Sequence, residues 1–185
     1  MKIQIIIGSV REGRLSKPVA DWALEQLQGR DDFEIELVDL KEWDLPMFSE
    51  AKSPAAGDYS NPVQKKWAEK IGEADGYIFV SPEYNHSFSA ALKNALDYLY
   101  NEWGRKPATF VTFGGVSGAR SVEQLRLVLV ELRMAALRDA VHIKDVWGKV
   151  KDGAFQADEA DLKQLKAAAE HLSWWSKTLK AGRDA

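Results

Sequence analysis

The residues best suited to chemistry stand near the start of the chain, between Gly8 and Lys17. An apolar run ends at Gly8, and a basic loop with two serines follows before a helix is expected. The glycine spacing is that of a triphosphate-binding loop, but Arg14 and Leu15 stand where such loops have Lys and Ser or Thr. Without those two residues, a magnesium-bound triphosphate is disfavoured. The loop predicts instead a phosphomonoester that is bound without a metal.

Three side chains of this loop are expected to contact the phosphate. Ser9 and Ser16 offer hydroxyl groups, and Arg11 can bind two phosphate oxygens at once. Backbone N–H groups at the start of the following helix add the positive end of its dipole. The alternative is a solvated basic turn that holds no ligand. Because the whole chain has a net charge of -3 and a pI of about 5.7, this local positive site suits a small anion better than a nucleic acid.

A second group of candidates follows a strand that should be central in the sheet. Pro82 cannot continue a central ladder, so the strand ends there, and residues 83–85 lie between its tip and the next helix. Exposed backbone groups and an aromatic face at that point suit a flat heterocycle with polar edges. Capping of the helix by Ser87 is the structural alternative. His86 has no Ser–His–Asp or metal-ligand partners in the sequence, so we expect it to be hydrogen-bonded or exposed.

The third group is the glycine-rich stretch 113–121. Its glycines permit close backbone approach to a ligand, and Ser117 adds a hydroxyl group. Glycine in such a loop is weak evidence by itself, because turns need glycine anyway. The prediction that this stretch binds a ligand is strengthened by its position, because it directly follows an expected strand, as the other two loops do.

A parallel α/β framework is needed to position these three loops. Apolar periodicity predicts five strands that alternate with helices, and each connection is long enough for a right-handed crossover. Ligands of such sheets bind beyond the carboxyl ends of the strands, where all three loops fall. The segment 41–62, which contains proline and glycine, is expected to be a long loop. The expected strands are 2–7, 33–40, 76–81, 108–113 and 140–146, and the expected helices are 17–28, 63–73, 87–103, 119–136 and 157–180.

Composition narrows the class of protein. A chain of 185 residues, 45% hydrophobic and 29% charged, suits one soluble domain. It has no cysteine, which excludes disulfides, thiolate catalysis and cysteine-bound metals, and no apolar stretch approaches the roughly 20 residues of a membrane span. The start MKIQIII predicts a first strand rather than a signal peptide. We therefore expect one cytoplasmic domain over residues 1–185, with no metal and no membrane or nucleic-acid partner.

The three loops and the spacing between them resemble those of the NADPH-dependent FMN reductase family of flavodoxin-like proteins. The most specific parts of the resemblance are the motifs Gly8-Ser9-x-Arg11 and Pro82-Glu83-Tyr84-Asn85-x-Ser87. The likeness extends from Met1 to about Val146. It implies a flavodoxin-like three-layer α/β/α sandwich with a five-stranded parallel sheet of order 2-1-3-4-5. It also implies bound FMN. The implied contacts are Ser9, Arg11, Leu15, Ser16 and Lys17 around the phosphate, Pro82, Glu83, Tyr84 and Asn85 along the isoalloxazine, and Ser117 and Gly118 near its other side.

The chain departs from the family pattern in three places. Lys17 stands where many members have Asn, and Arg120-Ser121 stands where the third loop often ends in a glycine pair. Arg14 is an extra basic residue, which either contacts the phosphate or helps to attract NADPH.

The resemblance implies an FMN-dependent NAD(P)H oxidoreductase. Such an enzyme reduces quinones, azo dyes, chromate or free flavin by two-electron, ping-pong transfer through flavin N5, with NADPH or NADH as co-substrate and no catalytic side chain. The alternative is a flavodoxin-like electron carrier or a flavin-bound regulatory module without turnover of its own. The arginines of the first loop and the lack of a strongly acidic surface argue against a carrier. A phosphotransferase or phosphatase would need a nucleophilic Cys or the missing Lys and Ser/Thr.

One expected helix, 123–137, carries more apolar surface than one covered face requires, and the expected helix 87–103 is a candidate to share its contact. A helix that is apolar almost all round is buried on both sides, so the segment 123–137 predicts a homodimer, which the family also implies, with a tetramer left open. Coverage by the last helix is the alternative. The last helix is expected to pack against the core through Leu162, Leu165, Leu172 and Trp175, which have helical spacing. The less favoured alternative is that Trp174 or Trp175 lines the flavin site. The residues of 123–137 used here are Leu125, Leu129, Leu132 and Ala136 on the inward stripe, and Leu127, Val128, Val130 and Met134 on other sides.

Overall fold

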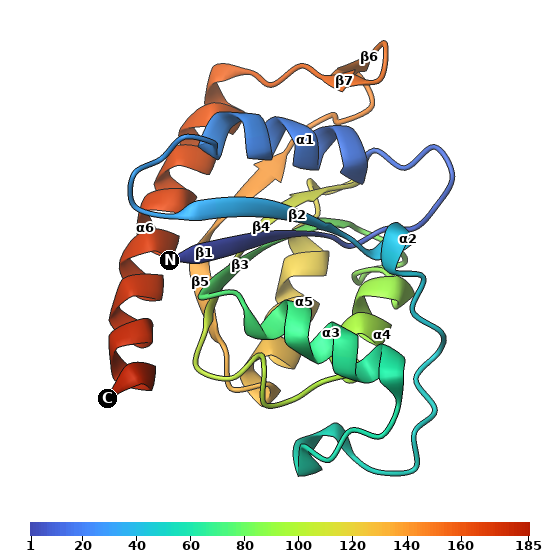
Figure 1. Cartoon of the computed structure of the whole chain (residues 1–185). Helices are drawn as coiled ribbons and strands as arrows, with labels where there is room; N and C mark the ends of the chain where they lie inside the picture. Colours follow the sequence, from blue (N-terminus) through green and yellow to red (C-terminus); the bar gives the residue numbers. More distant parts are fainter.

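Figure 1 shows the computed structural model, which describes all of residues 1–185 as a sheet between two layers of helices. The five parallel strands lie in the order β2-β1-β3-β4-β5, so the predicted flavodoxin-like fold and strand order are confirmed. In the central register, Ile5 of β1 pairs with Leu37 of β2 and Ile78 of β3. The central strands are buried on both faces, which explains their continuous apolar runs. The strands are β1 (Lys2–Ile7), β2 (Glu34–Asp39), β3 (Gly76–Pro82), β4 (Pro107–Phe113) and β5 (Ala135–Ile143).

The helices divide between the two faces of the sheet (Figure 1). Helices α1 (Ser16–Leu27) and α6 (Glu159–Asp184) cover one face, and α3 (Pro62–Gly72), α4 (Ala90–Asp97) and α5 (Ala119–Glu131) cover the other. Successive side chains of β1 point to opposite faces of the sheet and so contribute to both hydrophobic cores. Ile5 packs on the side of α1, and Ile6 packs on the side of α3, α4 and α5. Each core contains 21 buried residues, so neither face of the sheet is open.

Helix α4 is shorter than the expected helix 87–103. It begins after Ser89, whose hydroxyl accepts the N–H of Leu92, and not after Ser87 as the capping alternative proposed. It ends at Asp97, although the apolar residues beyond it remain buried. Trp103, for example, is fully buried and donates its indole N–H to the carbonyl of Leu96. Apolar spacing therefore identified buried residues correctly, but the last of them are held by turns.

The expected helix 119–136 was also too long. Helix α5 ends at Glu131, the chain reverses through Arg133 with φ of 58°, and β5 already begins at Ala135. Met134 is buried in this turn and Ala136 lies in the strand, so neither belongs to the helix. Leu127 and Val130 do project outward from α5, with 68% and 67% of their surfaces exposed.

Two segments outside the expected helices and strands contain short elements, and only the first of them was expected to be a long loop. The segment 41–62 includes most of α2 (Leu40–Trp43) and the 3₁₀ helix η1 (Pro54–Ala56), and the segment after β5 forms the hairpin β6 (Val150–Lys151) and β7 (Ala154–Phe155). The hairpin packs against α1, where the rings of Trp22 and Phe155 lie 5.1 Å apart. It also places the loop 144–149 beside the carboxyl ends of the strands.

The expected packing of Trp175 is wrong. Leu165 and Leu172 are buried, but Trp174 and Trp175 are 61% and 39% exposed and contact each other edge to face. Trp174 lies near Met1, at the amino-terminal edge of the sheet, and therefore far from the three loops.

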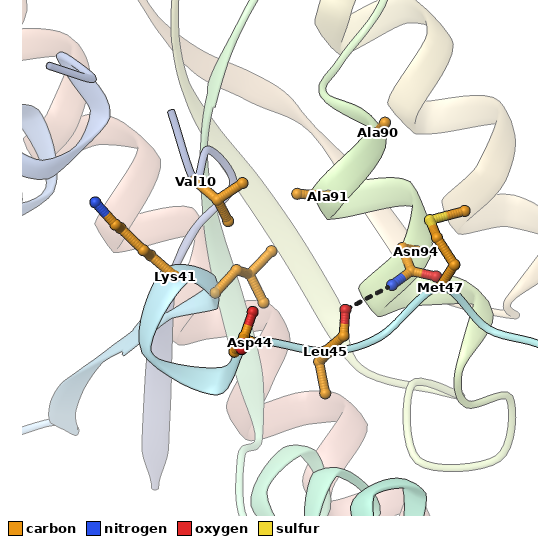
Figure 2. Close-up of a pocket in the computed structure, with 9 residues that line it drawn as sticks. Val10, Lys41, Asp44, Leu45, Met47, Ala90, Ala91 and Asn94 are labelled. Atoms are coloured by element: carbon orange, nitrogen blue, oxygen red, sulfur yellow. Dashed lines mark hydrogen bonds between the residues drawn. The ribbon is translucent and has the colours of Figure 1, made fainter. Parts of the chain in front are cut away.

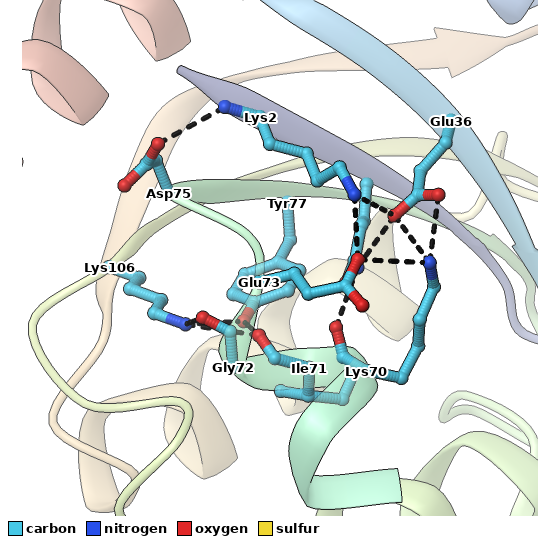
Figure 3. Close-up of polar contacts among 10 residues, drawn as sticks. Lys2, Glu36, Lys70, Ile71, Gly72, Glu73, Asp75, Tyr77 and Lys106 are labelled. Atoms are coloured by element: carbon cyan, nitrogen blue, oxygen red, sulfur yellow. Dashed lines mark hydrogen bonds and ion pairs between the residues drawn. The ribbon is translucent and has the colours of Figure 1, made fainter. Parts of the chain in front are cut away.

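Polar groups close this amino-terminal edge (Figure 3). The buried Lys106 ammonium donates to the carbonyls of Ile71 (3.0 Å) and Gly72 (3.2 Å) and to the hydroxyl of Tyr77 (3.2 Å), and so caps the end of α3. Burial lowers the pKa of Lys106 from its ordinary value of 10.5 to about 8. Nearby, Lys2 pairs with Glu73 at 2.6 Å. No helix of the chain combines the length and the apolar character needed to cross a membrane.

Candidate functional site

A cavity of about 340 Å³ lies at the carboxyl ends of the strands, where the three sequence motifs were expected to meet. The first loop forms one wall, the turn after β3 forms another, and the end of β4 closes the space between them. Its lining residues are Arg11, Gly13, Arg14, Leu15, Pro82, Glu83, Tyr84, Phe113, Gly114 and Trp147. The structure therefore brings residues of all three motifs around one cavity.

A hydroxyl pair links the first loop to the second. The buried Ser9 side chain lies 2.9 Å from the Tyr84 hydroxyl, and its Oγ accepts the backbone N–H of Arg11 at 3.5 Å. The guanidinium of Arg11 lies 5.7 Å from the centre of the Tyr84 ring and makes no ion pair with a carboxylate. An exposed arginine held beside an aromatic ring at a cavity wall is available to bind an anion.

The start of α1 has the properties of an anion site. Ser16 is fully buried, and its Oγ has no hydrogen-bond partner in the chain. The N-cap residue Leu15 offers no side-chain cap, so the first N–H groups of the helix have no acceptor in the chain. The Lys17 ammonium pairs with Asp21 at 2.5 Å, which leaves the backbone N–H of Lys17, and not its side chain, for a ligand. A phosphate would satisfy all these donors at once.

Arg14, which the sequence suggested as a contact for the phosphate or for NADPH, is paired with Asp39. Its guanidinium forms a two-bond ion pair with Asp39 at 2.7 and 2.5 Å and donates to the carbonyl of Ser9 at 2.6 Å. Asp39 is buried and Arg14 is mostly buried, with 5% and 11% of their side-chain surfaces exposed. Asp39 also accepts the N–H of Lys41 and thereby caps α2. Arg14 therefore fastens the first loop to the end of β2, and its charge is already compensated.

The second loop makes a tight turn. The backbone groups of Tyr84 and Ser87 bond to each other at 2.8 and 3.0 Å, and the two residues between them, Asn85 and His86, have φ of 48° and 72°. Asparagine tolerates this left-handed conformation well. Asn85 and His86 are both exposed. The turn thus places the Tyr84 ring and its hydroxyl group at the cavity wall.

Glu83 is bound to helix α5. Its carboxylate pairs with Arg120 at 2.5 Å and accepts the backbone N–H of the same residue at 3.3 Å. Only 4% of the Glu83 side chain is exposed. His86 completes this group, with its Nδ1 3.3 Å from the Arg120 guanidinium.

The third loop is shaped by two glycines and a strained serine. A Cβ on Gly114 would lie 2.8 Å from Cβ of Glu83, and one on Gly118 would lie 2.5 Å from Cβ of Thr112. Ser117 adopts φ of 56° and donates its N–H to the carbonyl of Gly114 at 2.9 Å. Gly118 is the N-cap residue of α5, with φ of 75°. Ser117 and Gly118 stand at this helix start, beyond the residues that line the cavity.

Sequence reasoning missed two contributors to this site. Trp147, which is 62% exposed, lines the cavity from the loop after β5, and Arg120 holds Glu83. The family pattern marks Arg120 only as a departure from a glycine pair. No sequence signal marked Trp147, because it lies in the irregular loop 144–149 between β5 and the hairpin, where no apolar periodicity points to a site.

A second cavity, of about 470 Å³, lies on the other side of the first loop (Figure 2). Val10, Ala90, Ala91 and Met47 give it a largely apolar lining. The amide of Asn94 fixes its outer wall, because it donates to the carbonyl of Pro46 at 2.8 Å. Val10 belongs to the first loop, so the two cavities share that loop as a partition.

The fold and this site define a flavodoxin-like protein with a phosphate-type loop after its first strand. The family model of the NADPH-dependent FMN reductases matches residues 1–148, and the chain belongs to that family. An NAD(P)H-dependent FMN reductase of Schizosaccharomyces pombe is 43% identical over 135 residues, which cover 72% of this chain and 68% of that protein. An NADPH:quinone oxidoreductase of Arabidopsis thaliana is 36% identical over 140 residues, with 71% and 68% covered.

A solved structure agrees with the fold. The FerB flavoenzyme NAD(P)H:(acceptor) oxidoreductase of Paracoccus denitrificans superposes with a TM-score of 0.73 over 96% of this chain and 97% of that one, at 23% sequence identity. The family assignment confirms the predicted class of enzyme, with FMN and NAD(P)H as the molecules it uses.

Proposed function

We propose that this chain binds FMN in the 340 Å³ cavity and uses it to transfer electrons from NAD(P)H to quinone-like acceptors. The observation that carries the proposal is the buried, unpartnered hydroxyl of Ser16 at the uncapped start of α1. A buried polar group without a partner is costly, so a native chain rarely keeps one unless a ligand or water completes it. A phosphomonoester beside Arg11 supplies that partner.

The phosphate is held by the first loop. Ser16 Oγ and the N–H groups of the first turn of α1 donate to it, and Arg11 neutralises part of its charge. Arg14 supports this arrangement from behind, because its ion pair with Asp39 fixes the loop. Lys17 contributes its backbone N–H. The proposed contacts Ser9 and Leu15 shape the same loop, Ser9 through the Tyr84 hydroxyl and Leu15 as a cavity wall.

The ring system lies along the second and third loops. Pro82 and Tyr84 give the cavity an apolar wall and an aromatic edge, and Gly114 lets the backbone approach where a side chain would collide with Glu83. The exposed turn at Asn85 and the loop at Ser117 and Gly118 supply backbone N–H and C=O groups for the polar edge of the ring.

When bound, FMN supplies two-electron transfer at its N5 atom, in ping-pong order between NAD(P)H and the acceptor. The side chains of the chain bind and orient. None of the side chains in or next to the cavity wall is placed as a nucleophile, because the carboxylate of Glu83 is paired and the hydroxyls of Tyr84 and the neighbouring Ser9 are bonded to each other. The kinship with an NADPH:quinone oxidoreductase supports quinones as one acceptor class.

We further propose that residues 1–185 act as one cytoplasmic FMN-binding domain. The family model ends at residue 148, but α6 beyond it supplies Leu165 and Leu172 to the same core as Ile5 and Val19. Removal of α6 would expose that face of the sheet, so the part matched by the family model needs the rest of the chain to stay folded.

One titration series tests the function. Flavin-free protein is mixed with FMN or with riboflavin, which lacks the phosphate, and binding is followed by flavin fluorescence. Tight binding of FMN, much weaker binding of riboflavin, and NADPH oxidation that depends on an added benzoquinone support the proposal. FMN binding without NADPH oxidation would favour the electron carrier or regulatory module. A protein that takes up no FMN would contradict both.

A further inference from the structure

An ion pair with a buried carboxylate joins two of the loops that form the walls of the 340 Å³ cavity. Glu83 belongs to the turn after β3, and Arg120 belongs to the first turn of α5, after the third loop. Their side chains meet at 2.5 Å, with the carboxylate 4% exposed and the guanidinium 38% exposed. The carboxylate of Glu83 is thus turned to the protein rather than left free for a ligand.

The contact does two things for α5. The N-cap residue of this helix is Gly118, which has no side chain to cap it. Glu83 supplies the cap from another loop, because its Oε2 accepts the N–H of Arg120 at 3.3 Å. A carboxylate at a helix start is also favoured by the helix dipole. Glu83 is therefore fixed by the helix as well as by the arginine.

The backbone of Glu83 is fixed as firmly as its side chain. Its N–H donates to the carbonyl of Phe113 at 2.8 Å, and only a glycine at position 114 leaves room for its Cβ. Tyr84, the next residue, lines the cavity and reaches Ser9 of the first loop. Any displacement of Glu83 therefore passes directly to Tyr84.

We propose that Arg120 is a positioning residue for the flavin, which acts through Glu83 by bracing the 82–87 turn against α5 and by cancelling the carboxylate charge beside the ring. This inference rests on the proposed function. Arg120 alone faces Glu83 as a charged partner, and His86 is the other titratable group in contact with Arg120. Without Arg120, a carboxylate that is almost fully buried would remain unpaired next to the cavity.

The two partners have opposite expected effects on the reduction potential of bound FMN. Reduction adds negative charge to the ring, so an uncompensated carboxylate nearby opposes it and an uncompensated guanidinium favours it. Arg120→Gln should make the potential more negative, and Glu83→Gln should make it less negative. The double variant should return close to the wild type. FMN should bind Arg120→Gln about tenfold more weakly.

A flavin-free readout tests the brace itself. Hydrogen exchange of the Tyr84 and Ser87 amides, which bond to each other's carbonyls, should become faster in flavin-free Arg120→Gln. Arg138→Gln and Glu69→Gln remove the same charges from exposed positions and serve as matched controls. Far-UV circular dichroism verifies that every variant is folded.

The outcomes separate this inference from the proposed function. Opposite shifts in the two single variants, with recovery in the double variant, support it. Shifts of the same sign, or no shift beyond the controls, would overturn it, as would unchanged exchange at Tyr84 and Ser87. If the wild-type protein binds no FMN, the proposed function fails first, while the exchange experiment still decides whether the brace exists.

Discussion

Replacement of Arg11 by alanine should weaken FMN binding without weakening the fold. The Arg11 side chain is exposed, and its contact with the chain is the face of Tyr84 at 5.7 Å. An exposed cation–π contact is worth about 0.5–1 kcal/mol at most. A charge-assisted hydrogen bond to phosphate is worth about 1.5–3 kcal/mol. Those values predict a dissociation constant for FMN that is about 10- to 100-fold larger, with the free energy of unfolding of the flavin-free protein nearly unchanged.

The assay compares two ligands in two proteins. FMN and riboflavin are each titrated into flavin-free wild type and Arg11→Ala. Binding is measured by the change in fluorescence of the isoalloxazine ring, which both ligands contain. Because riboflavin has no phosphate, its dissociation constant should be the same for both proteins, whereas that of FMN should rise only in the variant. Chemical denaturation of both proteins provides the stability control. An equal loss for both flavins would show that Arg11 acts on the ring or on the loop, and the phosphate assignment would be refuted.

Three other changes test separate features. Arg14→Ala should destabilise the flavin-free protein by about 3–5 kcal/mol, since it leaves the buried Asp39 unpaired, and urea denaturation measures it; a loss below about 1 kcal/mol would contradict a supporting role. Lys106 has a folded-state pKa of about 8, below its ordinary 10.5, so between these pH values the unfolded chain binds more protons than the folded one. The free energy of unfolding of wild type, relative to that of Lys106→Met, should therefore rise by about 2 kcal/mol from about pH 8 to 10. A flat difference in that window would argue against a desolvated ammonium. The double change Leu127→Glu and Val130→Glu on the exposed face of α5 should convert the expected homodimer to a monomer in light scattering, and a wild-type monomer would refute the dimer.

The sequence predicted the central strands β1, β3 and β4 well, because burial on both faces leaves an unbroken apolar run. It placed the last strand at 140–146, whereas β5, which is only partly buried, is Ala135–Ile143. It was weaker at helix ends, where Trp103 and Met134 keep the apolar spacing but are held by turns. For the site, the loop positions followed from the rule that parallel sheets bind ligands at the carboxyl ends of strands. The partners of each side chain did not follow. Arg14 and Glu83 are charged residues in ligand loops, and only three-dimensional contacts with Asp39 and Arg120 show that both charges are already compensated.

The hydroxyl of Ser89 has a consequence for how the two halves of a ligand are recognised. It caps α4, the helix that follows the second loop, and also donates to the carbonyl of Gly8, so the start of the first loop is tied to the start of α4. Ser9 and Tyr84 add a second tie at the cavity. A molecule that orders one loop therefore lowers the entropy cost of ordering the other. Inorganic phosphate and a bare isoalloxazine should accordingly bind with positive heterotropic cooperativity, and intact FMN should bind more tightly than the two fragments measured alone would suggest.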